Sequence, residues 1–176
     1  EIGVRLVGSE MCIRDSNNSY CQDNEISWID WSLLEKNKDL FEFFKFMIDY
    51  RKKHPVIRKK LDNAVCGMEA MHAHDVNAER MEVPQNAKTL AVSFAGYDRK
   101  KGKDDLVYVA VNAYWEEVKI TLPNLANHGA WYLSVDTYGD EKGKYFYQEG
   151  EEIRIDREYV MKPRSIVVFT GREILR

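Results

Sequence analysis

The sequence predicts a mainly β fold, an antiparallel β-sandwich preceded by a loop and one strongly apolar helix. Three observations predict it. Short apolar segments separated by turn residues follow one another from Thr89 onward, as in sandwich domains. One long apolar stretch, Leu40–Tyr50, comes before them without strand alternation. The chain has 176 residues, 44% of them hydrophobic, which is enough for one domain with a core and an appendage.

The predicted helix carries apolar side chains around most of its circumference. Asn37 or Asp39 can cap its first turn, and the basic cluster Arg51–His54 lies at its carboxyl end, before Pro55. That order suits the helix dipole and a proline stop. The polar positions form one narrow stripe: Glu42, Lys45, Asp49, Lys52 and Lys53. A surface helix normally has a smaller apolar arc, so we expect something large to cover more than half of this helix.

Alternation of apolar and polar residues predicts the strands, as in Val118–Leu122. The basic turn Arg99–Lys103 is predicted to be a solvated hairpin tip. Val56–Ile57 is predicted to begin a strand, and residues 63–86 show no clear period and are predicted to be irregular. The predicted strands are Thr89–Phe94, Leu106–Asn112, Glu117–Leu122, Trp131–Asp136, Glu152–Ile155 and Ser165–Thr170.

Composition argues against several classes of partner and site. The net charge of −3 comes without a basic stripe, so we expect no nucleic-acid partner. No apolar run is long enough to predict a membrane span. Three widely spaced cysteines, of which Cys21 and Cys66 are predicted to be buried thiols, indicate a reducing, cytoplasmic compartment. His72 and His74 lack a third ligand at metal-site spacing, so we expect an exposed pair and no metal.

The first residues have an unusual origin. Residues Leu6–Ser16 read LVGSEMCIRDS, which matches the translation of one reading frame of a transposon-based sequencing adapter. We therefore interpret residues 1–16 as a sequencing artefact and no domain, with Cys12 belonging to the artefact. We expect the natural chain to extend further toward its N-terminus.

Residues Asn17–Trp31 read NNSYCQDNEISWIDW. This segment resembles the one that follows the seventh barrel strand in bacterial glycogen-debranching enzymes and isoamylases of the α-amylase superfamily. Phe43–Pro55 resembles their last barrel helix, and the later apolar segments resemble the strands of their C-terminal β-sandwich. The resemblance implies that residues 17–55 are the end of a catalytic (β/α) barrel that is otherwise missing. Residues 56–176 would then be the C-terminal β-sandwich.

The resemblance also implies a function for the parent enzyme. It would be a retaining glycoside hydrolase that cleaves α-1,6 branch linkages in glycogen or starch-type glucans without a cofactor. Its catalytic Asp, Glu and second Asp lie upstream, so we expect no catalytic residue here and no activity from this chain alone. Asp23, Glu25 and Asp30 are predicted to be solvated turn formers.

The same resemblance places five loop side chains beside the glucan: Asn17, Asn18, Tyr20, Asp23 and Asn24. Asn and Asp side chains suit sugar hydroxyls, but these side chains can equally serve only to fold the loop. Trp28 and Trp31 are predicted to anchor the loop to the core rather than to stack on sugar.

Two other functions are compatible with the sequence. A non-catalytic carbohydrate-binding or scaffolding sandwich would bind glucan without hydrolysis, although the apolar helix argues against an independent domain. An α-amylase or a branching enzyme is a weaker possibility. The sandwich aromatics are predicted to be core rather than a surface sugar platform: Trp115, Trp131, Tyr132, Tyr145 and Tyr147.

Overall fold

The computed structural model describes residues 28, 30–78, 87–126 and 129–172. The chain divides into two compact units, residues 1–42 and 43–176. Helix α2 (Leu33–Lys36) lies in the first unit. Helix α3 (Lys38–Lys53) begins there and continues into the second unit, where a 3-10 turn (Pro55–Ile57) follows it. The strands are β1 (Met71–His74), β2 (Thr89–Asp98), β3 (Lys103–Asn112), β4 (Val118–Thr121), β5 (Ala130–Asp136), β6 (Ile153–Ile155), β7 (Glu158–Met161) and β8 (Ser165–Arg172).

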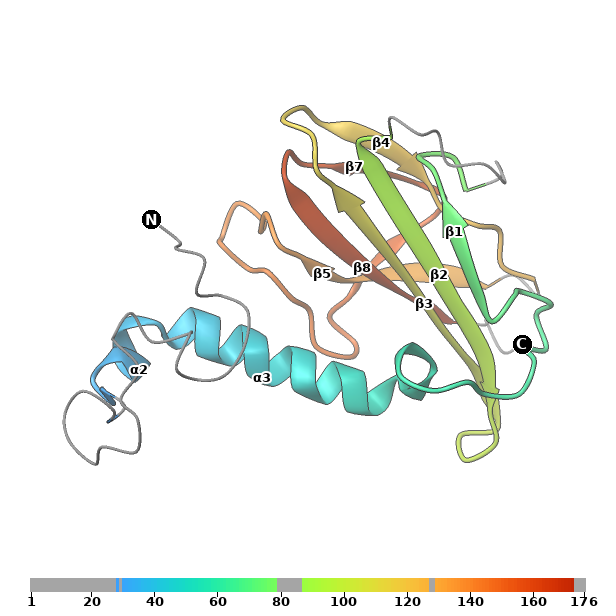
Figure 1. The fold of residues 1–176 in the computed structure, drawn as a ribbon, viewed down its shortest axis with the longest axis horizontal. Helices are drawn as coiled ribbons and strands as arrows, with labels where there is room; N and C mark the ends of the chain where they lie inside the picture. The colour runs from blue at the N-terminus through green and yellow to red at the C-terminus, as the bar shows by residue number, and fades with distance from the viewer. Residues whose placement is uncertain (1–27, 29, 79–86, 127–128, 173–176) are drawn as a thin grey trace. The chain divides into compact units, whose positions relative to one another are not determined.

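The strands of the second unit form two antiparallel sheets, drawn in Figure 1. In the described part of the chain, the larger sheet has six strands in the order β1-β2-β3-β8-β5-β6, and β4 pairs with β7 in the smaller sheet. Strands β2 and β3 are joined by a tight turn and pair along their whole length, from Thr89↔Asn112 to Asp98↔Lys103. The predicted mainly β, antiparallel fold is confirmed.

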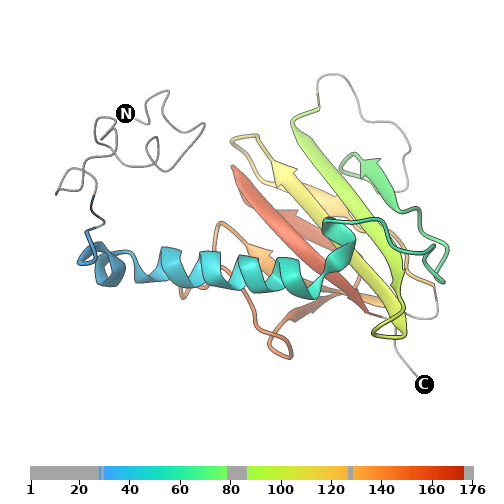
Figure 2. The same cartoon turned by 60° about the horizontal axis from the view of Figure 1, so that its bottom comes forward.

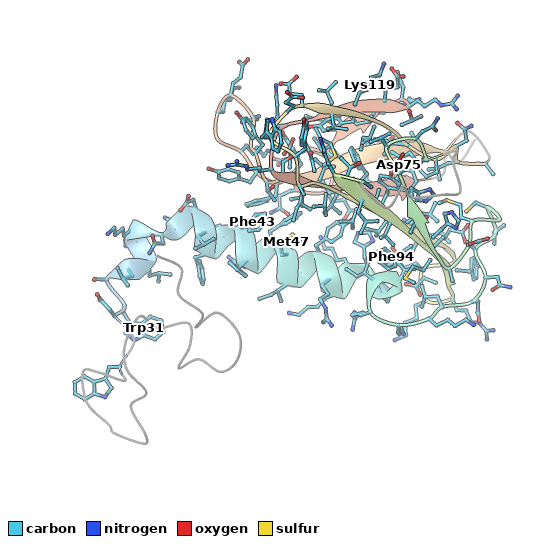
Figure 3. All side chains as sticks on the ribbon, turned by 45° about the horizontal axis from the view of Figure 1, so that its top comes forward. Trp31, Phe43, Met47, Asp75, Phe94 and Lys119 are labelled. Carbon is cyan, nitrogen blue, oxygen red and sulfur yellow. The ribbon has the colours of Figure 1, made fainter. Side chains whose placement is uncertain are left out.

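The main core lies between the two sheets. Ile120, Leu122 and Met161 from the smaller sheet and its flanks pack with Tyr108, Phe169 and other buried residues of the larger sheet. Burying each large apolar side chain contributes about 1.5–3 kcal/mol. On the outer face of the smaller sheet, Lys119 (Figure 3) pairs with Glu158 at 2.6 Å beside the exposed Val160.

A second apolar layer lies on the opposite face of the larger sheet. Figure 2 shows the carboxyl-terminal part of α3 running along this face. Phe43, Met47 and Phe94, labelled in Figure 3, belong to this layer. Its buried members are Tyr50, Val56, Val107, Val135 and Val168. The larger sheet is therefore packed on both faces, and its central strand β3 is almost continuously buried.

Most predicted elements are present with small changes at their ends. The helix and all six predicted strands are confirmed, and Arg99–Lys103 is an exposed hairpin tip as predicted. The strand start at Val56–Ile57 is wrong, because Pro55 begins a 3-10 turn there. The irregular prediction for residues 63–86 is wrong at β1, and β7 was not predicted. Among the described residues, no helix has both the length and the apolar character needed to cross a bilayer.

Candidate functional site

The side chains predicted to contact glucan, Asn17, Asn18, Tyr20, Asp23 and Asn24, lie outside the described residues. The predicted carboxylate Glu25, the thiols Cys12 and Cys21, and the segment 1–16 lie outside them as well. These assignments therefore remain predictions.

Asp30 is the described member of the carboxylates predicted to form turns. Its Oδ1 accepts hydrogen bonds from the hydroxyl and the backbone N–H of Ser32, at 2.6 and 3.0 Å. The hydroxyl first and the N–H second lower the pKa of Asp30. A general acid at neutral pH needs a raised pKa, so this carboxylate is suited to forming the turn and not to acid catalysis.

Trp28 and Trp31 are 58% and 72% exposed, and Figure 3 labels Trp31. That they anchor the loop stays a prediction, because residues 17–27 and 29 of the loop lie outside the described residues.

One face of α3 is fastened to the sandwich by buried polar contacts. The Tyr50 hydroxyl lies 2.8 Å from Thr170 Oγ1, which in turn lies 2.8 Å from Ser134 Oγ. Burial raises the pKa of Tyr50, so this hydroxyl stays protonated. The phenol therefore ties the helix to the middle of the larger sheet through a chain of neutral hydroxyl groups.

A second fastening lies where α3 ends. The buried Asp105 carboxylate lies 2.6 Å from His54 Nδ1 and accepts the backbone N–H of Val56 at 3.1 Å. One carboxylate thus holds the end of the helix and the following 3-10 turn together. Because buried polar groups are costly when unpaired, these bonds fix the position of this helix end on the sheet.

The other face of α3 is open. Phe44 and Ile48 are 60% and 54% exposed, and Leu40 and Phe41, nearer the start of the helix, are exposed as well. The helix is therefore not enclosed by the residues that follow it. Its apolar arc is covered on one side only, as predicted for a helix that needs a further partner.

The larger sheet carries exposed apolar residues on the same face that α3 covers in part. Leu90 pairs with Val111, and Val111 pairs with Ile166, so the three form one row across β2, β3 and β8. Leu90 and Ile166 are exposed and Val111 is half-buried. Sequence reasoning missed this row, although β2 has apolar side chains at both odd and even positions, a pattern typical of a strand covered on both faces.

The histidine pair is only partly as predicted. His72 is half-buried and pairs with Glu69 at 3.0 Å, whereas His74 is buried and bonded to Ser93 Oγ at 2.9 Å. The exposed-pair prediction is wrong for His74, because its side chain points from β1 into the sheet. In the described ranges, no group of three or more His, Cys, Asp or Glu side chains could hold a metal ion.

The sandwich aromatics do not form one surface platform. Trp131 is buried and donates from Nε1 to the Pro123 carbonyl at 2.7 Å, and Tyr147 is buried too. Trp115 contradicts the core prediction, because it is 64% exposed. Sequence reasoning also missed Tyr114, whose ring contacts Trp115. Both aromatics lie between predicted strands in the run Asn112–Glu117, where the sequence alone does not separate core from surface.

Comparison with known proteins identifies the domain. Residues 67–170, more than half of the chain, match the family described as isoamylase, C-terminal. The chain belongs to this family. The boundaries of the match agree with the sandwich, because they run from just before β1 into β8. The predicted resemblance to debranching enzymes is therefore confirmed.

Relatives of this isoamylase C-terminal domain carry glycogen and isoamylase names. A glycogen operon protein GlgX homolog of Mycobacterium bovis is 51% identical over 45 residues, covering 26% of this chain and 6% of the relative. Isoamylase 3, chloroplastic, of rice is 29% identical over 123 residues, covering 69% of this chain and 14% of the relative. An isoamylase of Flavobacterium is 27% identical over 194 residues, covering 97% of this chain and 24% of the relative. The chain thus spans a quarter or less of these relatives.

A solved structure shows the same fold. Pullulanase type I from Bacillus subtilis, in complex with maltose, matches with a TM-score of 0.56 and 20% identity, over 87% of this chain and 18% of the pullulanase. At this identity the likeness is evidence for the fold alone. The sandwich therefore has the architecture found in a part of this pullulanase.

Proposed function

We propose that this chain is the C-terminal part of a glycoside hydrolase that cleaves α-1,6 branch linkages in glycogen and starch-type glucans. Residues 17–55 would be the last loop and helix of its catalytic barrel, and residues 56–176 its C-terminal sandwich. The partners would be the upstream barrel and a branched α-glucan. The parent enzyme would work in the cytoplasm, without a cofactor.

The observation that carries this proposal is the two-sided helix α3. One face is fixed by Tyr50 and by the Asp105 carboxylate, while Phe44 and Ile48 on the other face are open. An exposed apolar surface of this kind costs solubility and normally marks an interface. A barrel that uses α3 as its last helix would cover this surface, which agrees with the resemblance of the segment to such a helix.

The proposed chemistry requires residues from that barrel. Retention at a glycosidic centre needs two carboxyl groups about 5–5.5 Å apart, one as nucleophile and one as acid. In (β/α) barrels such groups lie at the carboxyl ends of the strands. Asp30 does not supply the acid, because its hydrogen bonds to Ser32 lower its pKa. Asn17, Asn18, Tyr20, Asp23 and Asn24 would only contact substrate, so the chain alone would be inactive.

An activity assay tests the last point. The purified chain is incubated with glycogen, and new reducing ends are measured against a buffer blank. We expect no release above the blank, because the two catalytic carboxyl groups are supplied by the barrel. Reducing ends released in proportion to the amount of chain would contradict the proposal.

The genomic DNA immediately before the codon for Asn17 provides a second test. We expect it to encode a barrel with the Asp, Glu and second Asp of the superfamily in place of the adapter-like string. An upstream reading frame that encodes LVGSEMCIRDS in the genome, or an unrelated domain, would contradict the proposed domain organisation.

A further inference from the structure

Trp115 is a large aromatic side chain that the sandwich leaves open. It lies in the connection between β3 and β4, at the end of β3 opposite the β2–β3 turn (Figure 1). Its side chain is 64% exposed. No buried cluster of the described residues includes it, so a role in the core does not explain a tryptophan at this position.

The loop that carries Trp115 is held by hydrogen bonds on both sides. The buried Asn112 donates from Nδ2 to the carbonyls of Glu116 and Lys162, both at 2.9 Å, and its Oδ1 accepts the N–H of Tyr114 at 3.0 Å. The Tyr114 carbonyl accepts the N–H of Arg164 at 3.0 Å. One buried amide therefore holds the turn that presents Trp115.

The aromatic rings are themselves fixed. The centroids of Tyr114 and Trp115 lie 4.2 Å apart, with 38° between the planes. The Lys88 ammonium lies 3.7 Å from the Tyr114 centroid and 5.4 Å from that of Trp115. The backbone also contributes, because Ala113 N–H donates to the Lys88 carbonyl at 2.9 Å. A fixed aromatic surface loses little conformational entropy when a ligand stacks on it.

The surroundings of this pair indicate the class of ligand. Glu116 and Glu117 next to Trp115 are exposed, and Lys162 pairs with Glu117. The aromatic surface therefore has a charged, solvated rim of mixed sign. A pyranose fits such a site, because it offers an apolar face to the ring and hydroxyl groups to the polar rim.

We propose that Trp115 and Tyr114, with Lys88 beside them, form a binding surface for an α-glucan chain on the sandwich. The stacking requires only a pyranose, and the choice of an α-glucan rests on the proposed function. This surface would hold a branched polymer close to the parent enzyme and raise the local concentration of its chains.

The test is a calorimetric titration of the 176-residue chain with maltoheptaose. We expect saturable binding that Trp115→Ala weakens by at least about tenfold, while Trp115→Phe, which keeps an aromatic face, retains most of the affinity. Val65→Ala is the control, because Val65 is an exposed apolar residue, at 70%, and its backbone N–H bonds to Asp104, near the opposite end of β3 from Trp115. Circular dichroism confirms that each variant is folded.

Several results would overturn the proposal. They are no binding by the native chain, equal affinity in native and Trp115→Ala chains, an equal loss in Val65→Ala, or binding of cellohexaose but not maltoheptaose. A change in self-association on Trp115→Ala without a change in glucan affinity would assign the surface to a protein contact and overturn it too. Hydrolysis by the parent enzyme is not measured here, so failure of this site leaves the proposed function standing.

Discussion

Two buried tyrosines, Tyr50 and Tyr108, differ in whether the side-chain hydroxyl group has a hydrogen-bond partner. The Tyr50 hydroxyl lies 2.8 Å from Thr170 Oγ1. The Tyr108 hydroxyl is buried and has no hydrogen-bond partner among the described residues, and burial raises the pKa of Tyr108. A buried polar group left unpaired costs about 1–3 kcal/mol, so the two hydroxyl groups should affect stability in opposite directions.

Tyr108→Phe is expected to raise the free energy of unfolding by about 1 kcal/mol, because it removes an unpaired polar atom and keeps the ring. Tyr50→Phe is the matched control and is expected to lower the free energy of unfolding by about 1 kcal/mol, because the substitution removes the hydrogen bond to Thr170. Urea unfolding followed by circular dichroism measures both. Equal destabilisation by the two substitutions would mean that Tyr108 has a partner after all.

His74 is expected to make the fold less stable in mild acid. Burial first, and then the neighbouring His72, lower the pKa of His74. Its Nδ1 lies 3.1 Å from the Ala78 carbonyl, which suits a neutral ring that donates from Nδ1 and accepts at Nε2. The unfolded chain protonates this residue at a pH of about 6.5. The folded chain does so only at lower pH, so stability is complete above that value and falls as pH falls below it.

The measurement is urea unfolding at pH values on both sides of 6.5. His74→Gln is expected to flatten the loss of stability toward acid, even if it lowers stability throughout. His72→Gln is the control and should leave most of the slope in place, because its effect on His74 is secondary to burial. An unchanged slope in His74→Gln would assign the acid sensitivity to other groups.

At the scale of elements, the attachment of α3 depends on a few buried polar atoms. Asp105→Ala is expected to lower the free energy of unfolding by about 3 kcal/mol, because it leaves His54 and the Val56 N–H without their partner. Glu149→Ala is the control, since Glu149 pairs with Lys53 at 3.8 Å on the surface and should cost less than about 1 kcal/mol. Thermal or urea unfolding compares the two. A cost for Asp105→Ala no larger than that of the control would show that packing alone holds the helix.

Sequence periodicity predicts the long elements and misses the short ones for a physical reason. Strands β2 and β3 run for ten residues each, long enough for their apolar pattern to stand out. β1 and β7 have four residues each, and β1 is an edge strand with two histidines. These short strands are defined by tertiary contacts, because β1 pairs with β2 and β7 pairs with β4. A local pattern does not contain that information.

At the scale of the molecule, the sequence predicts where apolar surface remains but not its full extent. The apolar arc of α3 predicts a need for cover, and Phe44 and Ile48 on this helix are exposed in the described chain. The row through Leu90 and Ile166 could be recognised only once the register joined β2, β3 and β8. Similarly, Trp115 required the structure, because an aromatic residue between strands is equally compatible with core and surface.

These exposed apolar residues support the proposal that α3 belongs to a barrel supplied from upstream. A chimera tests this proposal. In the chimera, residues 17–176 replace the corresponding C-terminal region of the Flavobacterium isoamylase, whose match covers 97% of this chain. The Phe44→Lys/Ile48→Lys variant of the chimera removes the open apolar face. Val65→Lys is the control, since Val65 is exposed but remote from α3 in sequence.

The measurement is the rate at which the chimera releases linear chains from glycogen. If α3 is a helix of that barrel, the chimera debranches glycogen, its activity falls at least about tenfold with Phe44→Lys/Ile48→Lys, and Val65→Lys leaves the activity unchanged. A soluble, folded chimera without activity, or one that tolerates both lysines on α3, would contradict the proposal.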